Sequence, residues 1–111
     1  MELLQGTLDL LVLQALSPEA RLHGSAVQAR LERLSRGRLR VEEGSLYPAL
    51  YRLERRGWIA SAWGRSENNR KARLYHLTPA GRRQLAAERR GWEAFSEAVD
   101  AVLGKGLGQE P

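Results

Sequence analysis

The feature that most constrains the fold is a change of hydrophobic period at Gly57. Before this glycine, apolar residues recur at helical spacing; after it, two short segments have the composition and alternation of strands. A glycine directly after the last periodic residue is typical of the C′ position that ends a helix. The order of helices, hairpin and a final helix predicts a mainly α domain with one small antiparallel β-hairpin.

Three helices are predicted before Gly57, over residues 7–16, 25–34 and 43–56. Gly24 or Ser25 is the predicted N-cap of the second helix. Pro48 lies within the first two turns of the third helix, where it removes a backbone donor. We therefore expect it to bend or loosen the start of that helix.

The predicted strands are residues 58–63 and 73–77, and the residues between them form a polar, basic hairpin tip. Thr78 is predicted to cap a last helix, with Pro79 at its N1 position. This helix extends to about Leu103 and has apolar residues at heptad-like spacing, which indicates a packing seam. The seam residues are Leu85, Trp92, Phe95, Val99 and Val102.

The positive charge is concentrated in the middle third of the 111-residue chain. Residues 36–73 contain ten basic and four acidic side chains, a net charge of +6, whereas the whole chain is +5. We interpret this charge as lying on the third helix and the hairpin tip, which favours a polyanionic partner. A helix fits the major groove of DNA, about 12 Å wide, and a basic loop beside it can reach phosphates. The order of elements is that of a winged helix-turn-helix with an added C-terminal helix.

Composition excludes several other classes of protein. The chain has no cysteine and two histidines, so no thiolate metal site, disulfide scaffold or dense histidine site is expected. No nucleophile–base set or phosphate-cradling motif is present, so we expect neither an enzyme nor a cofactor. No apolar run reaches about 18 residues, so a protein of the cytoplasm, without a membrane span, is expected.

Four segments resemble the PadR family of bacterial transcriptional regulators. They are LQGTLDLL at residues 4–11, LHG at residues 22–24, EGSLYPAL at residues 43–50 and ENNRKARLYHLTPAG at residues 67–81. The GSLYPAL and NNRKARLYHLT parts are the specific ones, and the similarity extends over nearly the whole chain to about Leu103. The single C-terminal helix is similar to that of short-form members, which dimerise through it.

The resemblance implies a homodimer that binds double-stranded DNA at a roughly palindromic operator, usually as a repressor, and in some members is released by a flat hydrophobic or aromatic effector. It divides the chain into a DNA-binding domain (1–78), a dimerisation helix (79–103) and a flexible tail (104–111). By analogy the recognition helix supplies Ser45, Tyr47, Pro48 and Arg52, and the wing supplies Asn69, Arg70 and Lys71. Ser25 and Glu42 depart from the family pattern, in which Tyr and a Ser or Thr cap are common.

Several of these residues have a second interpretation. Tyr47 is either a DNA contact or a partly buried ring, and Arg52 is either a groove contact or a charge paired with Glu54 or Glu43. Arg73 is interpreted as structural. Because aromatic residues at helical spacing usually pack in cores, Trp92 and Phe95 are interpreted as dimer seam, with an effector pocket as the alternative.

A second function remains open at this point. A winged helix can also be a protein-interaction module, whose basic charge serves an acidic protein partner instead of DNA. Such a module would bind DNA weakly and without sequence preference.

Overall fold

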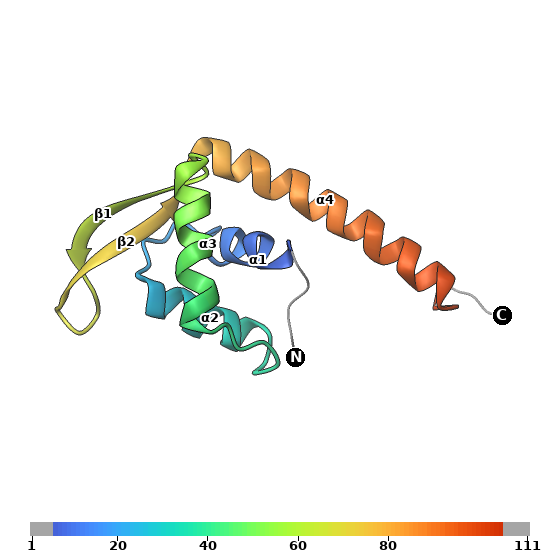
Figure 1. Cartoon of the computed structure of the whole chain (residues 1–111), viewed down its shortest axis with the longest axis horizontal. Coiled ribbons are helices and arrows are strands. Elements are labelled where there is room, and N and C mark those ends of the chain that lie inside the picture. Colours follow the sequence, from blue (N-terminus) through green and yellow to red (C-terminus); the bar gives the residue numbers. More distant parts are fainter. Residues whose placement is uncertain (1–5, 106–111) are drawn as a thin grey trace.

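Four helices and one two-stranded sheet follow each other in the predicted order (Figure 1). The computed structural model describes residues 6–105. The helices are α1 (Thr7–Ala15), α2 (Gly24–Leu34), α3 (Glu43–Arg55) and α4 (Pro79–Val102), and the strands are β1 (Ile59–Arg65) and β2 (Lys71–Leu77). The prediction of a mainly α fold with one antiparallel hairpin is confirmed. Most of the predicted tail, residues 106–111, lies outside the described residues.

One apolar core joins α1, α2, α3, the base of the hairpin and the start of α4. Val12, Leu13, Leu46, Leu50 and Leu53 are completely or almost completely buried in it. The predicted apolar stripes included Val12, Leu46, Leu50 and Leu53. Leu13 was missed, because the predicted stripe of the first helix used Leu8 and Leu11 instead, and these two are only partly buried. No polar or charged side chain among residues 6–105 is buried with them.

The helix ends follow local sequence signals, with one correction. Gly57 has φ +76° and follows the C-cap of α3, as predicted, because glycine adopts this left-handed backbone without a steric penalty. The N-cap of α2 is His23, not Gly24 or Ser25, and its carbonyl accepts hydrogen bonds from the amides of Ala26 and Val27. Its side chain makes no capping hydrogen bond, so the sequence offered no polar cap signal there.

α3 continues as one helix through Pro48. The expected cost of a proline at the sixth residue of this helix is the loss of one backbone hydrogen bond. That loss falls on the exposed face of the helix, where Gly44 and Pro48 are both in contact with solvent. The N-cap, Glu42, makes no side-chain capping bond, consistent with its departure from the family pattern.

The hairpin strands are longer than predicted and its tip is shorter. The pairs Gly64–Ala72 and Arg65–Lys71 extend the ladder into the predicted tip and leave only residues 66–70 outside it. Asn69 adopts φ +60°, and its amide donates to the Ser66 carbonyl over 2.8 Å. The polar composition of the segment concealed this pairing, because Arg, Lys and Gly are weak strand formers.

A further pairing joins the hairpin to the segment before α2. Leu22 and Tyr75 exchange two backbone hydrogen bonds of 3.0 and 2.8 Å. No sequence pattern indicates this single bridge, because the segment around Leu22 has no alternation of apolar and polar residues. It holds the start of α2 against β2.

α4 begins against the base of the hairpin and then extends away from the body of the molecule (Figure 1). Thr78 caps it as predicted: its hydroxyl oxygen accepts from the Gly81 amide at 3.0 Å and the hydroxyl donates to the Gly57 carbonyl at 2.6 Å. Only Gly81 and Leu85 of this helix are buried. Leu85, predicted as part of the seam, is thus a core residue of its own chain.

We expect Gly81→Ala to destabilise the fold, because a Cβ at this position would overlap the Trp58 carbonyl oxygen and lie 2.8 Å from its carbonyl carbon. Backbone cannot yield as a flexible side chain does, so the cost is about 1–3 kcal/mol of unfolding free energy or more. Gly91→Ala is the matched control in the same helix, since nothing lies within 4 Å of its Cβ position. It should raise stability by up to about 1 kcal/mol. Chemical denaturation of both variants checks this; equal stabilities would contradict the packing.

Candidate nucleic-acid interface

The outward face of α3 is a strip of polar and aromatic side chains. Its inward face is buried through Leu46, Ala49, Leu50 and Leu53. Among the predicted site residues, Ser45, Tyr47, Pro48 and Arg52 all lie exposed on the helix. Tyr51 and Arg55 are also exposed on this helix, with the Arg55 guanidinium 5.7 Å from the Tyr51 ring centroid. Both were omitted from the predicted site although the helical period already placed them on this face.

Tyr47 has the partly buried ring of one interpretation, and its contact with DNA stays a prediction. Its side chain is partly exposed, and its ring lies against Gly24 at the start of α2. A Cβ at Gly24 would lie 2.6 Å from the Tyr47 Cζ and would overlap the hydroxyl. The absent side chain at Gly24 is therefore what allows the ring to lie along α2 with its edge in solvent.

Arg52 has a different partner from the two predicted. Its guanidinium forms an ion pair of 2.7 Å with Asp9 of α1, and not with Glu54 or Glu43. The prediction considered only neighbours on the same helix, whereas the fold brings α1 across the back of α3. Arg52 remains about half exposed, so the pair fixes its position without burying it.

The hairpin tip presents the three predicted wing residues, Asn69, Arg70 and Lys71, all exposed. Asn69 is in the turn, and its carbonyl accepts a hydrogen bond from the Arg65 guanidinium at 3.3 Å. Lys71 is the first residue of β2, and its ammonium lies 5.1 Å from the centroid of the Trp63 ring. The tip is thus a turn of defined backbone with two adjacent cations.

Trp63 is a site feature that the sequence interpretation missed. Its side chain is 62% exposed, and both Lys71 and Arg73 stack on its ring, with Arg73 at 5.3 Å. Trp63 and Arg73 are direct partners in the hairpin register. The predicted strand ends, residues 63 and 73, already face each other in an antiparallel hairpin, but no contact between these two side chains was predicted from that pairing.

A hollow of about 360 Å³ lies between α3 and β2. It is lined by Tyr47, Tyr51, Glu54, Arg55, Arg73 and Tyr75. Glu54 accepts a hydrogen bond of 2.6 Å from the Ser61 hydroxyl, which itself accepts one of 2.9 Å from Arg73 Nε. Burial raises the pKa of the Tyr75 phenol, the nearby Glu54 carboxylate raises it further, and Arg73 opposes the shift. Tyr75 is therefore a neutral hydroxyl at physiological pH.

The excess charge is distributed differently from the prediction. α3 itself has two acidic residues, Glu43 and Glu54, and two basic ones, so the helix is neutral. Three of the ten basic residues of 36–73, Arg36, Arg38 and Arg40, lie instead on the turn between α2 and α3, which has a net charge of +2 with Glu42 included.

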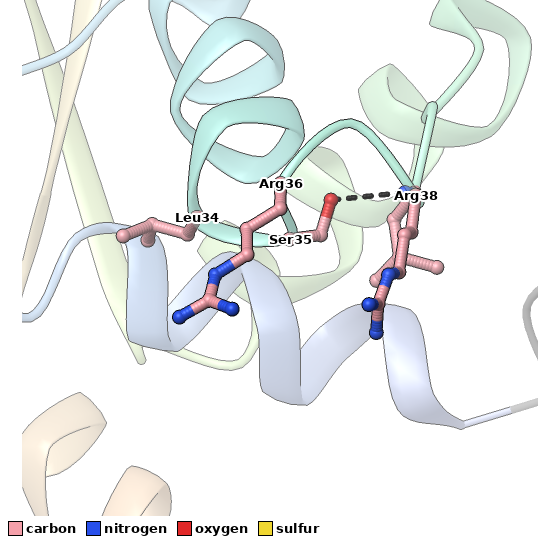
Figure 2. Close-up of a pocket in the computed structure, with 5 residues that line it drawn as sticks. Leu34, Ser35, Arg36 and Arg38 are labelled. Carbon is pink, nitrogen blue, oxygen red and sulfur yellow. Dashed lines mark hydrogen bonds between the residues drawn. The ribbon is translucent and has the colours of Figure 1, made fainter.

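Figure 2 shows Arg36 and Arg38 projecting from the same side of this turn, beside the hydrogen bond from the Leu39 amide to the Ser35 hydroxyl. Within the described chain none of the three turn arginines forms an ion pair. The basic elements are consequently the turn and the hairpin, on either side of a neutral helix. The predicted helix bounds, 25–34 and 43–56, already left these arginines outside both helices, so assigning their charge to the third helix was wrong.

The far part of α4 exposes a row of large apolar side chains. Trp92, Phe95, Val99 and Val102 are all exposed, and the first two rings lie 6.1 Å apart at 47°. These are the predicted seam residues other than Leu85. Isolated exposed apolar residues are common, but an aligned row on one helix is typical of a surface that another element covers.

Residues 6–105 contain no cluster of three or more His, Asp or Glu side chains that could hold a metal ion. In the same range no helix has the length and hydropathy needed to cross a membrane.

Helix-turn-helix, basic hairpin and exposed helical strip together define a winged-helix transcription regulator. The family model described as "Transcriptional regulator PadR-like family" matches residues 12–87. The chain therefore belongs to the PadR-like family, whose members are DNA-binding transcription regulators and not enzymes.

Known relatives agree with this assignment. The chain is 43% identical over 68 residues to Transcriptional regulator Rv3488 of Mycobacterium tuberculosis, a match that covers 61% of this chain and 63% of that protein. A transcriptional regulator from Clostridium thermocellum superposes with a TM-score of 0.78 at 25% identity, covering 87% of this chain and 93% of that one. A PadR-like transcriptional regulator from Bacillus cereus gives 0.74 at 27% identity, over 89% and 93% of the two chains.

We expect Asp9 and Arg52 to be energetically coupled. A double-mutant cycle of Asp9→Asn and Arg52→Gln, followed by chemical denaturation, should give a coupling of about 0.5 kcal/mol, the usual range for a partly exposed pair. The matched cycle uses Glu43→Gln with Arg52→Gln and should give none. Coupling to Glu43 in place of Asp9 would contradict the observed geometry.

Proposed function

We propose that this protein is a homodimeric repressor that binds a roughly palindromic operator in the cytoplasm. α3 would enter the major groove, the hairpin would act as the wing on the flanking phosphates, and α4 would join two copies. In this proposal residues 1–78 bind DNA and residues 79–103 dimerise. The observation that supports it most is the continuous exposed strip from α3 to the hairpin, formed by aromatic, hydroxyl and cationic side chains.

The chemistry of the strip suits duplex DNA. Hydroxyl groups of Ser45, Tyr47 and Tyr51 can donate hydrogen bonds to base edges or phosphates, and the Arg55 guanidinium can bond two acceptors at once. On the wing, Arg70 and Lys71 supply charge at the exposed tip, with the Lys71 ammonium beside the Trp63 ring. Neutralising phosphates in this way releases counterions and gives salt-dependent affinity.

The exposed row on α4 supports the dimer. A second copy would cover Trp92, Phe95, Val99 and Val102, whereas Leu85 is already buried in its own chain. We propose the tilted Trp92–Phe95 pair as the contact for a flat hydrophobic or aromatic effector, because its rings would lie at that seam.

A gel shift on the promoter region of the protein's own gene tests the proposal. The protein should prefer this DNA to random DNA at moderate salt. Weak binding without preference, together with a stable complex with an acidic protein in a pull-down, would favour a protein-interaction module instead.

Removing the two tip cations should weaken DNA binding for every sequence. We expect Arg70→Ala with Lys71→Ala to reduce the slope of log affinity against log salt by about 2, since each lost phosphate contact removes roughly 0.9. Titrations at several salt concentrations measure it. The matched control is Arg89→Ala with Arg90→Ala, an adjacent exposed basic pair on α4. An unchanged slope in the tip variant would exclude the wing from the phosphate contact.

Charged substitutions in the α4 row should separate the dimer. With Trp92→Glu and Val99→Glu, two copies would bring carboxylates together inside an apolar seam, where burial of unpaired charge is strongly unfavourable. Light scattering should then give the mass of a monomer, near 12.5 kDa. Ala94→Glu, on an exposed residue of the same helix that lies on another face, is the control. A persistent dimer in the double variant would place the interface elsewhere.

A further inference from the structure

We propose that the hollow between α3 and β2 seats one backbone phosphate of the bound DNA, with Arg73 as its main ligand and with Trp63 and Ser61 as positioning residues. The inference rests on the proposed function and extends it to residues that the sequence interpretation treated as structural or overlooked. Three sets of contacts support it: those that hold Arg73, those that line the hollow, and those on the Trp63 ring.

Arg73 is held from two directions while its donor end remains available. Its Nε donates to the Ser61 hydroxyl oxygen at 2.9 Å, and its guanidinium carbon lies 5.3 Å from the Trp63 ring centroid. Within residues 6–105 it forms no ion pair. The two terminal nitrogens are therefore free to bond two oxygens of one phosphate, the geometry for which a guanidinium is best suited.

The lining of the hollow fits an anion. Two guanidiniums, of Arg55 and Arg73, face a single carboxylate, that of Glu54. Glu54 accepts the hydrogen bond of the Ser61 hydroxyl, so one of its oxygens is already occupied. Tyrosine hydroxyls add neutral donors: Tyr47, Tyr51 and Tyr75. The net charge of this lining is +1, on a surface between the groove-reading helix and the wing.

Ser61 connects Glu54 of α3 to Arg73 of β2 through its hydroxyl group. Its hydroxyl donates to Glu54 of α3 and accepts from Arg73 of β2, although it belongs to β1. The chain of hydrogen bonds fixes the guanidinium relative to the recognition helix. A phosphate seated here would consequently be in register with the bases that α3 contacts.

Trp63 reduces the entropic cost of binding. Lys71 and Arg73 are long side chains that lose rotamer freedom when they grip a phosphate. Both already stack on the exposed face of Trp63, so part of that freedom is absent before DNA arrives. The ring itself contributes no charge, which separates its role from that of Arg73.

The experiment compares Arg73→Ala, Trp63→Ala, Trp63→Phe and Ser61→Ala in DNA titrations over a range of salt. Arg73→Ala should lower affinity for every sequence and reduce the salt slope by about 1. Trp63→Ala keeps both charges, so the slope should stay while affinity falls about threefold to tenfold, the loss expected for two exposed cation–π contacts. Trp63→Phe should retain most of the wild-type affinity. Ser61→Ala should lower the affinity without changing the salt slope, as Trp63→Ala does. Arg83→Ala, an exposed arginine on α4, controls for the loss of one charge.

A second measurement identifies the phosphate. Operator DNA with a single neutral methylphosphonate is scanned position by position. At one position the methylphosphonate should lower the affinity of the wild-type protein. The same substitution should not change the affinity of Arg73→Ala, because this variant already lacks the contact with that phosphate. Thermal melting by circular dichroism confirms that each variant is folded, as expected for the exposed Trp63.

The outcomes separate the two proposals. If the wild-type protein shows no DNA preference, the proposed function itself is overturned. If the wild type binds specifically but Trp63→Ala binds equally well, or no methylphosphonate position couples to Arg73, the phosphate seat is overturned and the proposed function stands.

Discussion

The arrangement of the whole interface depends on the hydrogen bonds of Thr78. Its hydroxyl bridges the Gly57 carbonyl and the Gly81 amide, and its own amide donates to the Trp58 carbonyl at 3.1 Å. Four elements meet at this threonine: the end of α3, the start of β1, the end of β2 and the start of α4. Because Gly81 has no side chain, α4 can approach the Trp58 carbonyl closely enough for these bonds to form.

This junction determines what the two functional surfaces can do. On one side it fixes the hairpin against α3, where Ser61 and Glu54 add a second connection. On the other side it sets the direction in which α4 leaves the body, and so the position of the exposed apolar row. In a dimer formed through that row, the same few hydrogen bonds would set the distance between the two recognition helices.

Local signals were sufficient to predict the elements, and contacts between distant residues were not. Gly57 and Thr78 mark helix ends through their own backbone and side-chain chemistry, so both were identified from the sequence. The partner of Arg52 lies on another helix, 43 residues away, and no periodicity indicates it. Leu85 shows the same limit, since a heptad pattern does not distinguish packing within a chain from packing between chains.

The interface residues show a similar division. Membership of the exposed face of α3 follows from helical spacing, and the tip cations follow from composition. The predicted strand ends, residues 63 and 73, already implied that Trp63 faces Arg73, but the contact with Lys71 requires the longer β2 that the structure shows. The charge of the α2–α3 turn was counted but assigned to the third helix, although the predicted helix bounds left the turn arginines outside it.

The neutrality of α3 has a consequence for how a regulator of this kind would find its target. In the proposed complex the turn and the wing would supply attraction to any stretch of duplex, and such attraction permits sliding along the DNA. A recognition helix without net charge would add no electrostatic attraction of its own at sites with the wrong sequence. Holding the duplex and reading its sequence would then fall to separate elements, so that the search along the DNA would be fast and the stop selective.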